Sequence, residues 1–256
     1  MSGTPRTNGT NGGRGGLGSV LSGAAVAVGC VLFLGGFGWG AFTYQPYTVP
    51  TDSMTPTIKA GERVLAQRIS GDDVRRGDVV VFTDPVWGNM PMVKRVVGVG
   101  GDKVACCDRD GRLTVDGKPI AEPYLAKSLG GPASMQTFTS SVPEGRLFLL
   151  GDERSGSLDS RVHLQDPSQG AVARSEVNAR VDAVVWPMGS LIDRPAGFAA
   201  LPGGVSEPGP LKLVAGAMVA GAVLILGGAA YGPLARRRRP VERDGRRAGD
   251  GVSAGV

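Results

Sequence analysis

The chain has 256 residues, 41% of them apolar, and a formal net charge of +5. This length suits one sizeable domain or two small ones, and 42 glycines with 18 prolines indicate many loops and little long soluble helix. The tails 1–16 and 236–256 hold nine arginines and three acidic residues, hence a charge of +6, which leaves −1 for the remainder. That remainder offers no basic face, so we expect no binding to nucleic acid.

Two long uncharged segments lie next to these tails. Residues 17–42 are mostly small and apolar, and residues 213–235 contain no charged side chain. Because about 20 apolar residues cross a bilayer core as a helix, we predict a transmembrane helix in each segment. The first segment also has the basic start and apolar centre of a cleaved signal peptide. Its length and the lack of an A-x-A site before Phe42 favour an uncleaved anchor.

The arginines indicate the orientation of both helices. Positively charged flanks tend to stay inside the cell, so residues 1–16 and 236–256 are predicted to be cytoplasmic tails. Residues 43–196 then form a domain on the outer side of the plasma membrane, and residues 197–212 form a linker into the second helix. The sequence thus predicts a multi-pass membrane protein, with membrane lipid as one partner.

The outer segment has the pattern of a β domain. Short runs of β-branched and aromatic residues alternate with turn-forming Gly, Asp and Pro residues, and no stretch between residues 60 and 190 keeps a helical period. We therefore predict a mostly β fold with a transmembrane helix near each terminus, and a flexible loop or insertion at residues 130–141. The expected strands are residues 79–82, 92–99, 113–115, 147–150 and 182–186.

The three cysteines predict neither a disulfide framework nor a metal site. Cys30 lies inside the first apolar segment, where a small apolar role fits best. Cys106 and Cys107 are adjacent, and such a pair closes into a disulfide only through a strained ring, so their state stays open. The one histidine, His163, is far from them in the sequence. We expect no metal and no cofactor.

A serine lies on an irregular loop in the stretch PTDSMTPT, residues 50–57. Prolines on both sides keep Ser53 out of a regular helix or a central strand, and a structural role in a turn is the plain interpretation. As a nucleophile, Ser53 needs a base, and histidine is the usual one. His163 precedes a polar loop, which is typical of a surface histidine.

Lys94 is the other candidate base. In a strand over residues 92–99 alternate residues share a face, so Met92, Lys94 and Val96 lie together. Apolar neighbours that desolvate the amine lower its pKa from about 10.4 towards neutrality. A lysine at a sheet edge, with its amine in water, fits the same pattern equally well.

Four segments carry a family resemblance. SMTPT (53–57), GDVVVF (77–82), VKRVVGVGGDKV (93–104) and GDERSGSLDSR (151–161) resemble, in order and spacing, the motif boxes of type I signal peptidases. These bacterial proteases are anchored in the membrane and use a serine–lysine dyad. The resemblance covers most of residues 47–190 and requires the membrane topology predicted above.

The resemblance assigns roles to individual residues. It implies that Ser53 is the nucleophile, that Lys94 is the general base and that Ser157 orients the lysine amine. Thr51 falls where the family often has a hydroxyl donor to the oxyanion, and the backbone N–H of Ser53 is the other implied donor. The residues that hold the family's site together are matched by Arg95, Asp159 and Arg161.

The implied substrates are secretory preproteins. Cleavage would follow small residues at −1 and −3, with the substrate bound as an extended strand beside shallow apolar pockets. Trp87 is a candidate for contact with the bilayer surface, and ordinary packing explains it equally well. The oligomeric state is not predicted.

Two positions depart from the family pattern. Glu153 replaces a usual Asn, which puts one local hydrogen bond in doubt. Gly100 replaces the proline of the usual Gly-x-Pro-Gly-Asp, so a looser turn is expected there. Neither touches the dyad. Two other functions stay open, namely a catalytically silent membrane-anchored homologue and a cell-surface binding protein. The only signal for the latter is the RGD tripeptide at 76–78, which also fits a tight turn into a strand.

Overall fold

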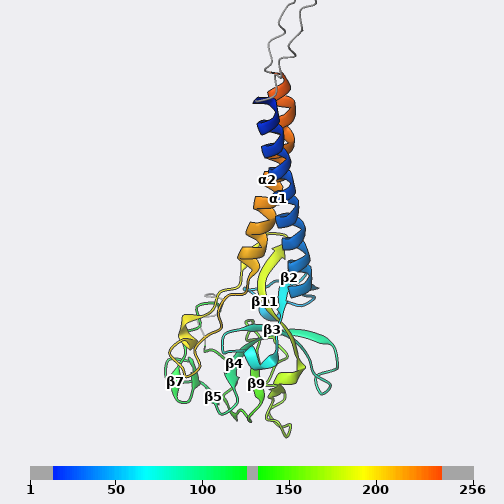
Figure 1. Ribbon diagram of the computed structural model, residues 1–256. Helices are drawn as coiled ribbons and strands as arrows, with labels where there is room; N and C mark the ends of the chain where they lie inside the picture. Colours follow the sequence, from blue (N-terminus) through cyan, green and yellow to red (C-terminus); the bar gives the residue numbers. More distant parts are fainter. Residues whose placement is uncertain (1–13, 126–131, 238–256) are drawn as a thin grey trace, which may run out of the picture. The chain divides into compact units, whose positions relative to one another are not determined.

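The computed structural model describes residues 14–125 and 132–237, and the chain divides into two compact units. One unit contains Met1–Phe37 with Ala215–Val256, and the other contains Gly38–Val214. Two long helices, α1 (Arg14–Thr43) and α2 (Leu211–Arg237), occur near the chain ends, and short strands lie between them in the sequence (Figure 1). The mostly β fold with two apolar helices is therefore confirmed. The predicted tails fall almost wholly outside the described residues.

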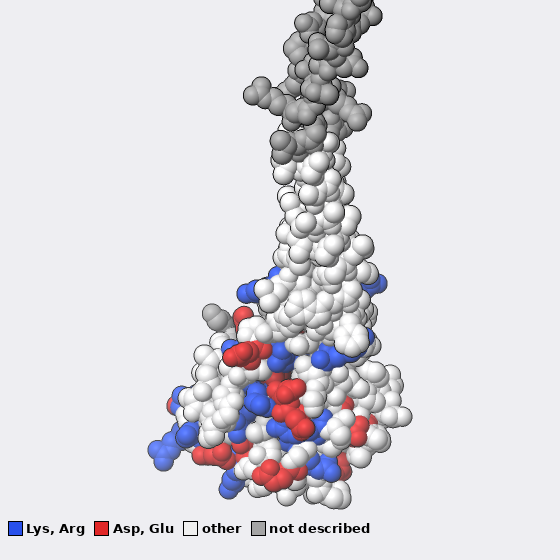
Figure 2. Space-filling view, viewed as in Figure 1, with Lys and Arg blue, Asp and Glu red and all other residues white. Residues whose placement is uncertain are grey.

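Both helices are long and apolar enough to cross a bilayer, over Gly18–Thr43 and Leu211–Tyr231. Few of their side chains are buried, unlike those of a core helix in a soluble protein. Figure 2 shows their described surface as largely uncharged, while Lys, Arg, Asp and Glu gather on the β domain. These features are consistent with a membrane protein.

Small residues let α1 and α2 approach each other closely. The Gly221 carbonyl oxygen lies 2.8 Å from where a Cβ on Gly29 would be, and the Phe33 amide nitrogen lies 2.6 Å from a Cβ on Gly221. The Ser22 hydroxyl donates a hydrogen bond of 2.7 Å to the Gly228 carbonyl. In lipid, close backbone packing and interhelical hydrogen bonds hold helices together, because lipid tails are as apolar as the side chains.

The larger sheet is antiparallel and runs through the β domain. Its order is β1 (Tyr44–Thr48), β2 (Arg63–Arg68), β11 (Val177–Trp186), β3 (Val79–Thr83), β4 (Pro91–Val99), β9 (Arg146–Leu150) and β10 (Val172–Ala173), with β12 (Ser190–Leu191) beside β11. Val79 and Val81 pack in one hydrophobic cluster, and Val80 and Phe82 in another. The sheet is therefore covered on both faces. Short 3₁₀ turns lie between strands at η1 (Asp52–Met54), η2 (Gly71–Asp73) and η4 (Arg174–Glu176), and η5 (Ala196–Phe198) lies between β12 and α2.

The smaller sheet has the order β7 (Lys118–Pro119), β6 (Leu113–Val115), β5 (Lys103–Cys106) and β8 (Phe138–Ser141). Its apolar side chains form a third cluster with Phe148 of β9. β8 lies within residues 130–141, where the sequence predicted a flexible loop or insertion. That prediction is wrong for β8, because Phe138 and Ser140 are buried and the strand pairs with β5. Residues 126–131 lie outside the described residues.

The segment expected as a linker, residues 197–212, is folded against the β domain. Phe198 is fully buried and Leu201 nearly so, in the cluster beneath the smaller sheet. The Ser206 hydroxyl donates a hydrogen bond to the buried Asp78 carboxylate. The linker prediction is corrected, because these buried side chains make the segment part of the domain despite its Gly- and Pro-rich sequence.

Candidate active site

Ser53 lies on a tight turn between β1 and β2. The turn is the 3₁₀ segment η1, and it is held by the fully buried side chain of Met54. The Ile58 amide donates a hydrogen bond of 2.9 Å to the Met54 carbonyl, so the chain turns again just after the serine. Prolines at 50 and 56 prevent a regular strand from running through this stretch. The half-buried Ser53 hydroxyl is therefore presented from a fixed backbone.

Lys94 reaches this turn from β4. Its strand is paired with β3, where Val80 is its partner, and only 4% of the Lys94 side chain is exposed. The amine nitrogen Nζ lies 2.8 Å from Ser53 Oγ and 3.1 Å from the Val93 carbonyl oxygen. Burial lowers the pKa of Lys94 from 10.5 to about 8, although the Asp159 and Asp152 carboxylates oppose this. The two candidate residues, 41 positions apart in the sequence, are thus in hydrogen-bond contact.

Arg95 points away from Lys94 and forms a buried ion pair. Its Nε and Nη2 donate to the two carboxylate oxygens of Asp152, at 2.8 and 2.7 Å. The Thr57 hydroxyl also donates to Asp152. Because Thr57 follows the Ser53 turn and Asp152 follows β9, this cluster fastens the two segments together. Both charged side chains are almost fully buried, and two hydrogen bonds between them offset the cost of desolvation.

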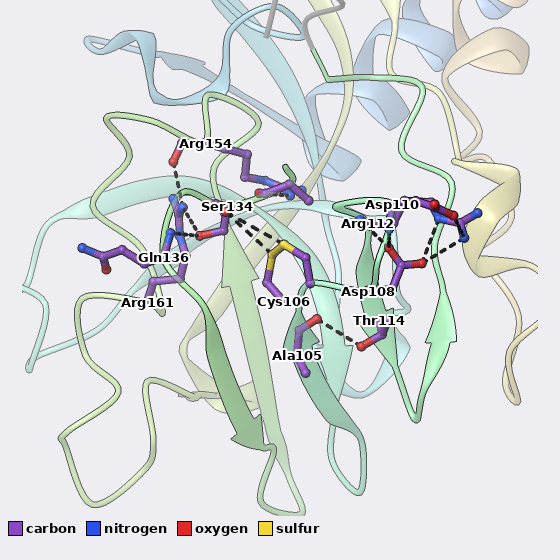
Figure 3. The surroundings of a disulfide bond; sticks show 12 residues. Ala105, Cys106, Asp108, Asp110, Arg112, Thr114, Ser134, Gln136, Arg154 and Arg161 are labelled. Atoms are coloured by element: carbon purple, nitrogen blue, oxygen red, sulfur yellow. Dashed lines mark hydrogen bonds and ion pairs between the residues drawn. A yellow bond between two sulfur atoms is a disulfide. The ribbon is translucent and has the colours of Figure 1, made fainter. Parts of the chain in front are cut away.

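Asp159 and Arg161 shape the loop that follows β9. The Gly151 amide donates to Asp159 at 3.0 Å, and Arg161 binds the same carboxylate with two hydrogen bonds of 2.8 and 2.7 Å. Arg161 also donates to the Arg154 carbonyl at 2.7 Å, and Figure 3 shows both arginines beside Ser134. The loop is therefore closed on itself by a buried carboxylate.

The same loop touches the Ser53 turn through Glu153. The Glu153 amide donates to the Ser53 carbonyl at 3.1 Å. Its carboxylate accepts a hydrogen bond of 2.5 Å from the Gly156 amide, and hydrogen bonding by Ser155 lowers the pKa of Glu153. The replacement of the family Asn is thus accommodated by hydrogen bonds inside the loop.

Ser157 and Thr51 are close to Ser53 but differ in their contacts. The Thr51 hydroxyl donates to Ser53 Oγ at 3.2 Å. Ser157 is 7% exposed, and among the described residues its hydroxyl has no hydrogen-bond partner, so the expected contact with Lys94 is not made in this structure. A Cβ added to Gly151 would overlap with Ser157 and lie 2.5 Å from the Ser53 carbonyl oxygen. Ser157 is therefore packed tightly beside the turn.

An apolar cavity opens over the Ser53–Lys94 pair. Its volume is about 610 Å³. Met92 lines it as the alternation predicted, but Val93, from the opposite predicted face, lines it too, and Val96 packs in a core cluster instead. The other apolar lining residues are Tyr47, Val49, Pro50, Val81, Trp87, Met90, Pro91 and Leu158.

His163 does not contact Ser53 in this structure. Its Nδ1 lies 3.0 Å from an Asp166 carboxylate oxygen, and its ring is stacked on Trp87 with 4.6 Å between the ring centroids. Trp87 also packs edge-on against Phe82. Packing thus accounts for much of the Trp87 surface.

Comparison with known proteins decides the family. The family model described as signal peptidase, peptidase S26, matches residues 21–186. The chain belongs to the S26 signal peptidase family. The resemblance noted from the four motif segments is thereby confirmed.

Curated relatives of this signal peptidase family member come from several bacteria. The chain is 32% identical over 202 residues to a probable signal peptidase I of Mycobacterium leprae, covering 57% of this chain and 70% of that one. It is 35% identical over 164 residues to signal peptidase IB of Staphylococcus aureus, covering 58% and 81%. A crystal structure of signal peptidase I from Enterococcus faecalis shares 31% identity and covers 41% of this chain and 94% of the other, with a TM-score of 0.35. The family assignment follows from the sequence matches.

Sequence reasoning missed two residues that brace this signal peptidase site. Asp152 is the buried partner of Arg95, and Arg154 is buried and paired with Glu122. Asp152 and Arg154 both stand in the segment GDERSGSLDSR, but charged loop residues normally face water. No local signal separates these two from their exposed neighbours, since the partner Glu122 lies 32 residues away from Arg154.

The described ranges 14–125 and 132–237 contain no group of three or more His, Cys, Asp or Glu placed to hold a metal ion.

Cys30 is free, whereas Cys106 and Cys107 form a disulfide. Both of its sulfur atoms lie 3.9 Å from the Ser134 carbonyl oxygen. Figure 3 shows the disulfide beside Ser134. The disulfide thus abuts the segment that Arg161 also contacts.

Proposed function

We propose that this protein is a membrane-bound signal peptidase I that cleaves preproteins with a Ser53–Lys94 dyad. The observation that carries the proposal is the 2.8 Å contact between Ser53 Oγ and the buried amine of Lys94. A lysine takes a proton from serine only when it is neutral, and burial favours the neutral amine. The pKa of about 8 supports this role near neutral pH.

In the first half of the reaction, Lys94 accepts the hydroxyl proton while Ser53 Oγ attacks the scissile carbonyl carbon. The carbonyl oxygen becomes an oxyanion, for which the Ser53 N–H and the Thr51 hydroxyl are the proposed donors. Lys94 then gives its proton to the departing amine, and the C–N bond breaks to leave an acyl-enzyme. In the second half, a water loses a proton to Lys94 and attacks the ester carbonyl carbon. The bond between that carbon and Ser53 Oγ then breaks, Lys94 returns the proton to Oγ, and the acyl product leaves with a new C-terminal carboxyl group.

The charged residues around the dyad act by positioning it. Arg95 fastens the Ser53 turn to the loop after β9 through Asp152, and Asp159 with Arg161 closes that loop. Ser157 is proposed to orient the Lys94 amine once a substrate displaces water from the site. Its buried hydroxyl has no partner among the described residues and is therefore available.

The apolar cavity suits the substrate class. A signal peptide presents small side chains before its cleavage site, and an extended chain places alternate residues on one side. We propose that residues at −1 and −3 enter the cavity beside Val93 and Leu158. Two membrane-spanning helices with cytoplasmic tails would hold the domain at the outer surface, where secretory preproteins expose this site.

Cleavage of a preprotein by the detergent-solubilised full-length protein tests the proposal. The N-terminal sequence of the product is expected to begin directly after a small residue, with another small residue two positions earlier. The variants Ser53→Ala and Lys94→Met should give no product. Product formation by Ser53→Ala would exclude the dyad, and no cleavage by the wild-type protein would favour a catalytically silent homologue.

A further inference from the structure

A second cavity is lined mostly by the loop after β9. Its volume is about 480 Å³, and we call it the mature-side groove. It is lined by Ser134, Met135, Gln136, Arg154, Ser155, Gly156, Ser157, Leu158, Arg161 and Val162. Figure 3 shows part of this lining, with Ser134 and Gln136 on one segment and the two arginines reaching towards it.

Three exposed apolar side chains gather in this groove. Met135 is 80% exposed, Leu158 71% and Val162 57%. Single exposed apolar residues are ordinary on a protein surface, but a cluster inside a cavity marks a surface that binds something. Leu158 and Val162 lie in the loop after β9, and Met135 lies in the segment before β8, so the fold brings two separate segments together here.

The charges of the groove are already paired within the domain. Arg161 is bound to the fully buried Asp159, and Arg154 is bound to Glu122. Both guanidinium groups are also bound to backbone carbonyl oxygens. The groove therefore offers little free charge to an acidic ligand. Its lining mixes neutral polar groups with the three exposed apolar side chains, and these three offer contact to an apolar group.

The groove and the active-site cavity are neighbours, because Gly156 and Leu158 line both. Glu153, in the same loop, is bonded to the Ser53 carbonyl, so the loop lies directly beside the nucleophile. An extended chain that fills the active-site cavity and passes Ser53 can continue over Leu158 into the groove.

We propose that this groove binds an apolar side chain from the first residues on the mature side of the cleaved bond. Met135 and Val162 are then specificity-determining residues for the segment that becomes the N-terminus of the secreted protein. The inference rests on the proposed function, because the occupant is the preprotein substrate itself. It adds a preference for an apolar residue after the cleaved bond to the proposed preference for small residues before that bond.

Paired peptide substrates test this proposal with the full-length protein in detergent. The peptides share one signal segment and carry either leucine or serine at each of the first mature positions in turn. For the best position, we expect kcat/KM to be about fivefold higher with leucine, as partial burial of one apolar side chain allows. In Met135→Ser and in Val162→Ser this ratio should fall to about 2 or less.

The matched control is Met188→Ser, because Met188 is 81% exposed and does not line the groove. It should keep the wild-type ratio. Equal kcat/KM for leucine and serine peptides at every position would overturn the inference. An unchanged leucine-to-serine ratio of kcat/KM in both Met135→Ser and Val162→Ser would overturn it too. Either result leaves the peptidase proposal intact. If wild-type protein cuts none of the peptides, nor the parent preprotein, the proposed function itself fails.

Discussion

The proposed Ser53–Lys94 dyad predicts a pH dependence of catalysis that is set by the burial of Lys94. Burial lowers the pKa of its amine from 10.5 to about 8, against the opposing effect of Asp159 and Asp152. At 1.36 kcal/mol per pKa unit, the charged amine is disfavoured by roughly 3 kcal/mol. At pH 7 about one Lys94 in ten is then neutral, against fewer than about one in a thousand for a free lysine.

We therefore expect kcat/KM to rise about tenfold per pH unit on the acid side and to level off close to the pKa of Lys94. Initial rates on a peptide substrate without ionisable groups near the cut, measured across the pH range in detergent, provide the profile. Lys94→Arg should be inactive, because guanidinium stays protonated. His163→Ala should keep the position of the acid limb.

Two outcomes would refute this reasoning. One is an acid limb with its midpoint near the value of free histidine, about 6.5, that disappears in His163→Ala. The other is a Lys94→Arg variant with wild-type kcat/KM. Either result would show that Lys94 is not the base.

Four further predictions concern the site and the topology. Ser157→Ala should lower kcat at least about tenfold with little change in KM, since it acts on the base; steady-state kinetics will contradict this if KM rises instead. Gly151→Ala should lower the unfolding free energy by about 1–3 kcal/mol through overlap with Ser157, whereas Gly189→Ala, with its nearest neighbour 3.7 Å away, should not. Lys94→Met should have a higher melting temperature than wild type at pH 7. The difference in melting temperature should narrow as the pH rises from about 8 to 10.5, because in this range the folded wild type, with its lowered Lys94 pKa, binds fewer protons than the unfolded chain. A C-terminal tag should resist protease added to intact spheroplasts, and its digestion would contradict the predicted orientation of α2.

The sequence predicted the parts of the fold that have strong local patterns. Uncharged runs predicted both helices to within a few residues, and β-branched runs predicted β3, β4, β6, β9 and the end of β11. β2, with arginine at both ends, and β8, with three consecutive hydroxyl residues, lack such a pattern. These strands are stabilised by pairing with distant neighbours, which no local window reveals.

The candidate site was proposed from the sequence where the motif resemblance supplied residue identities. It named Ser53 and Lys94, but composition and periodicity alone left Lys94 equally consistent with an exposed edge. The structure resolves that alternative, because Lys94 is buried and in contact with Ser53. A register shift between Val96 and Gly98 interrupts the pairing of β4 with β9, and no local pattern predicted it.

The burial of Phe198 and Leu201 determines where a soluble catalytic fragment can be cut from this chain. A fragment that stops at Pro195 would leave an empty, water-exposed hollow in the core beneath the smaller sheet. Removal of one buried phenylalanine side chain alone costs about 3–5 kcal/mol, a large part of a domain's stability. Fragments for crystallisation or inhibitor screening should therefore begin at Tyr44 and extend through Gly209, so that the segment with Phe198 and Leu201 stays attached.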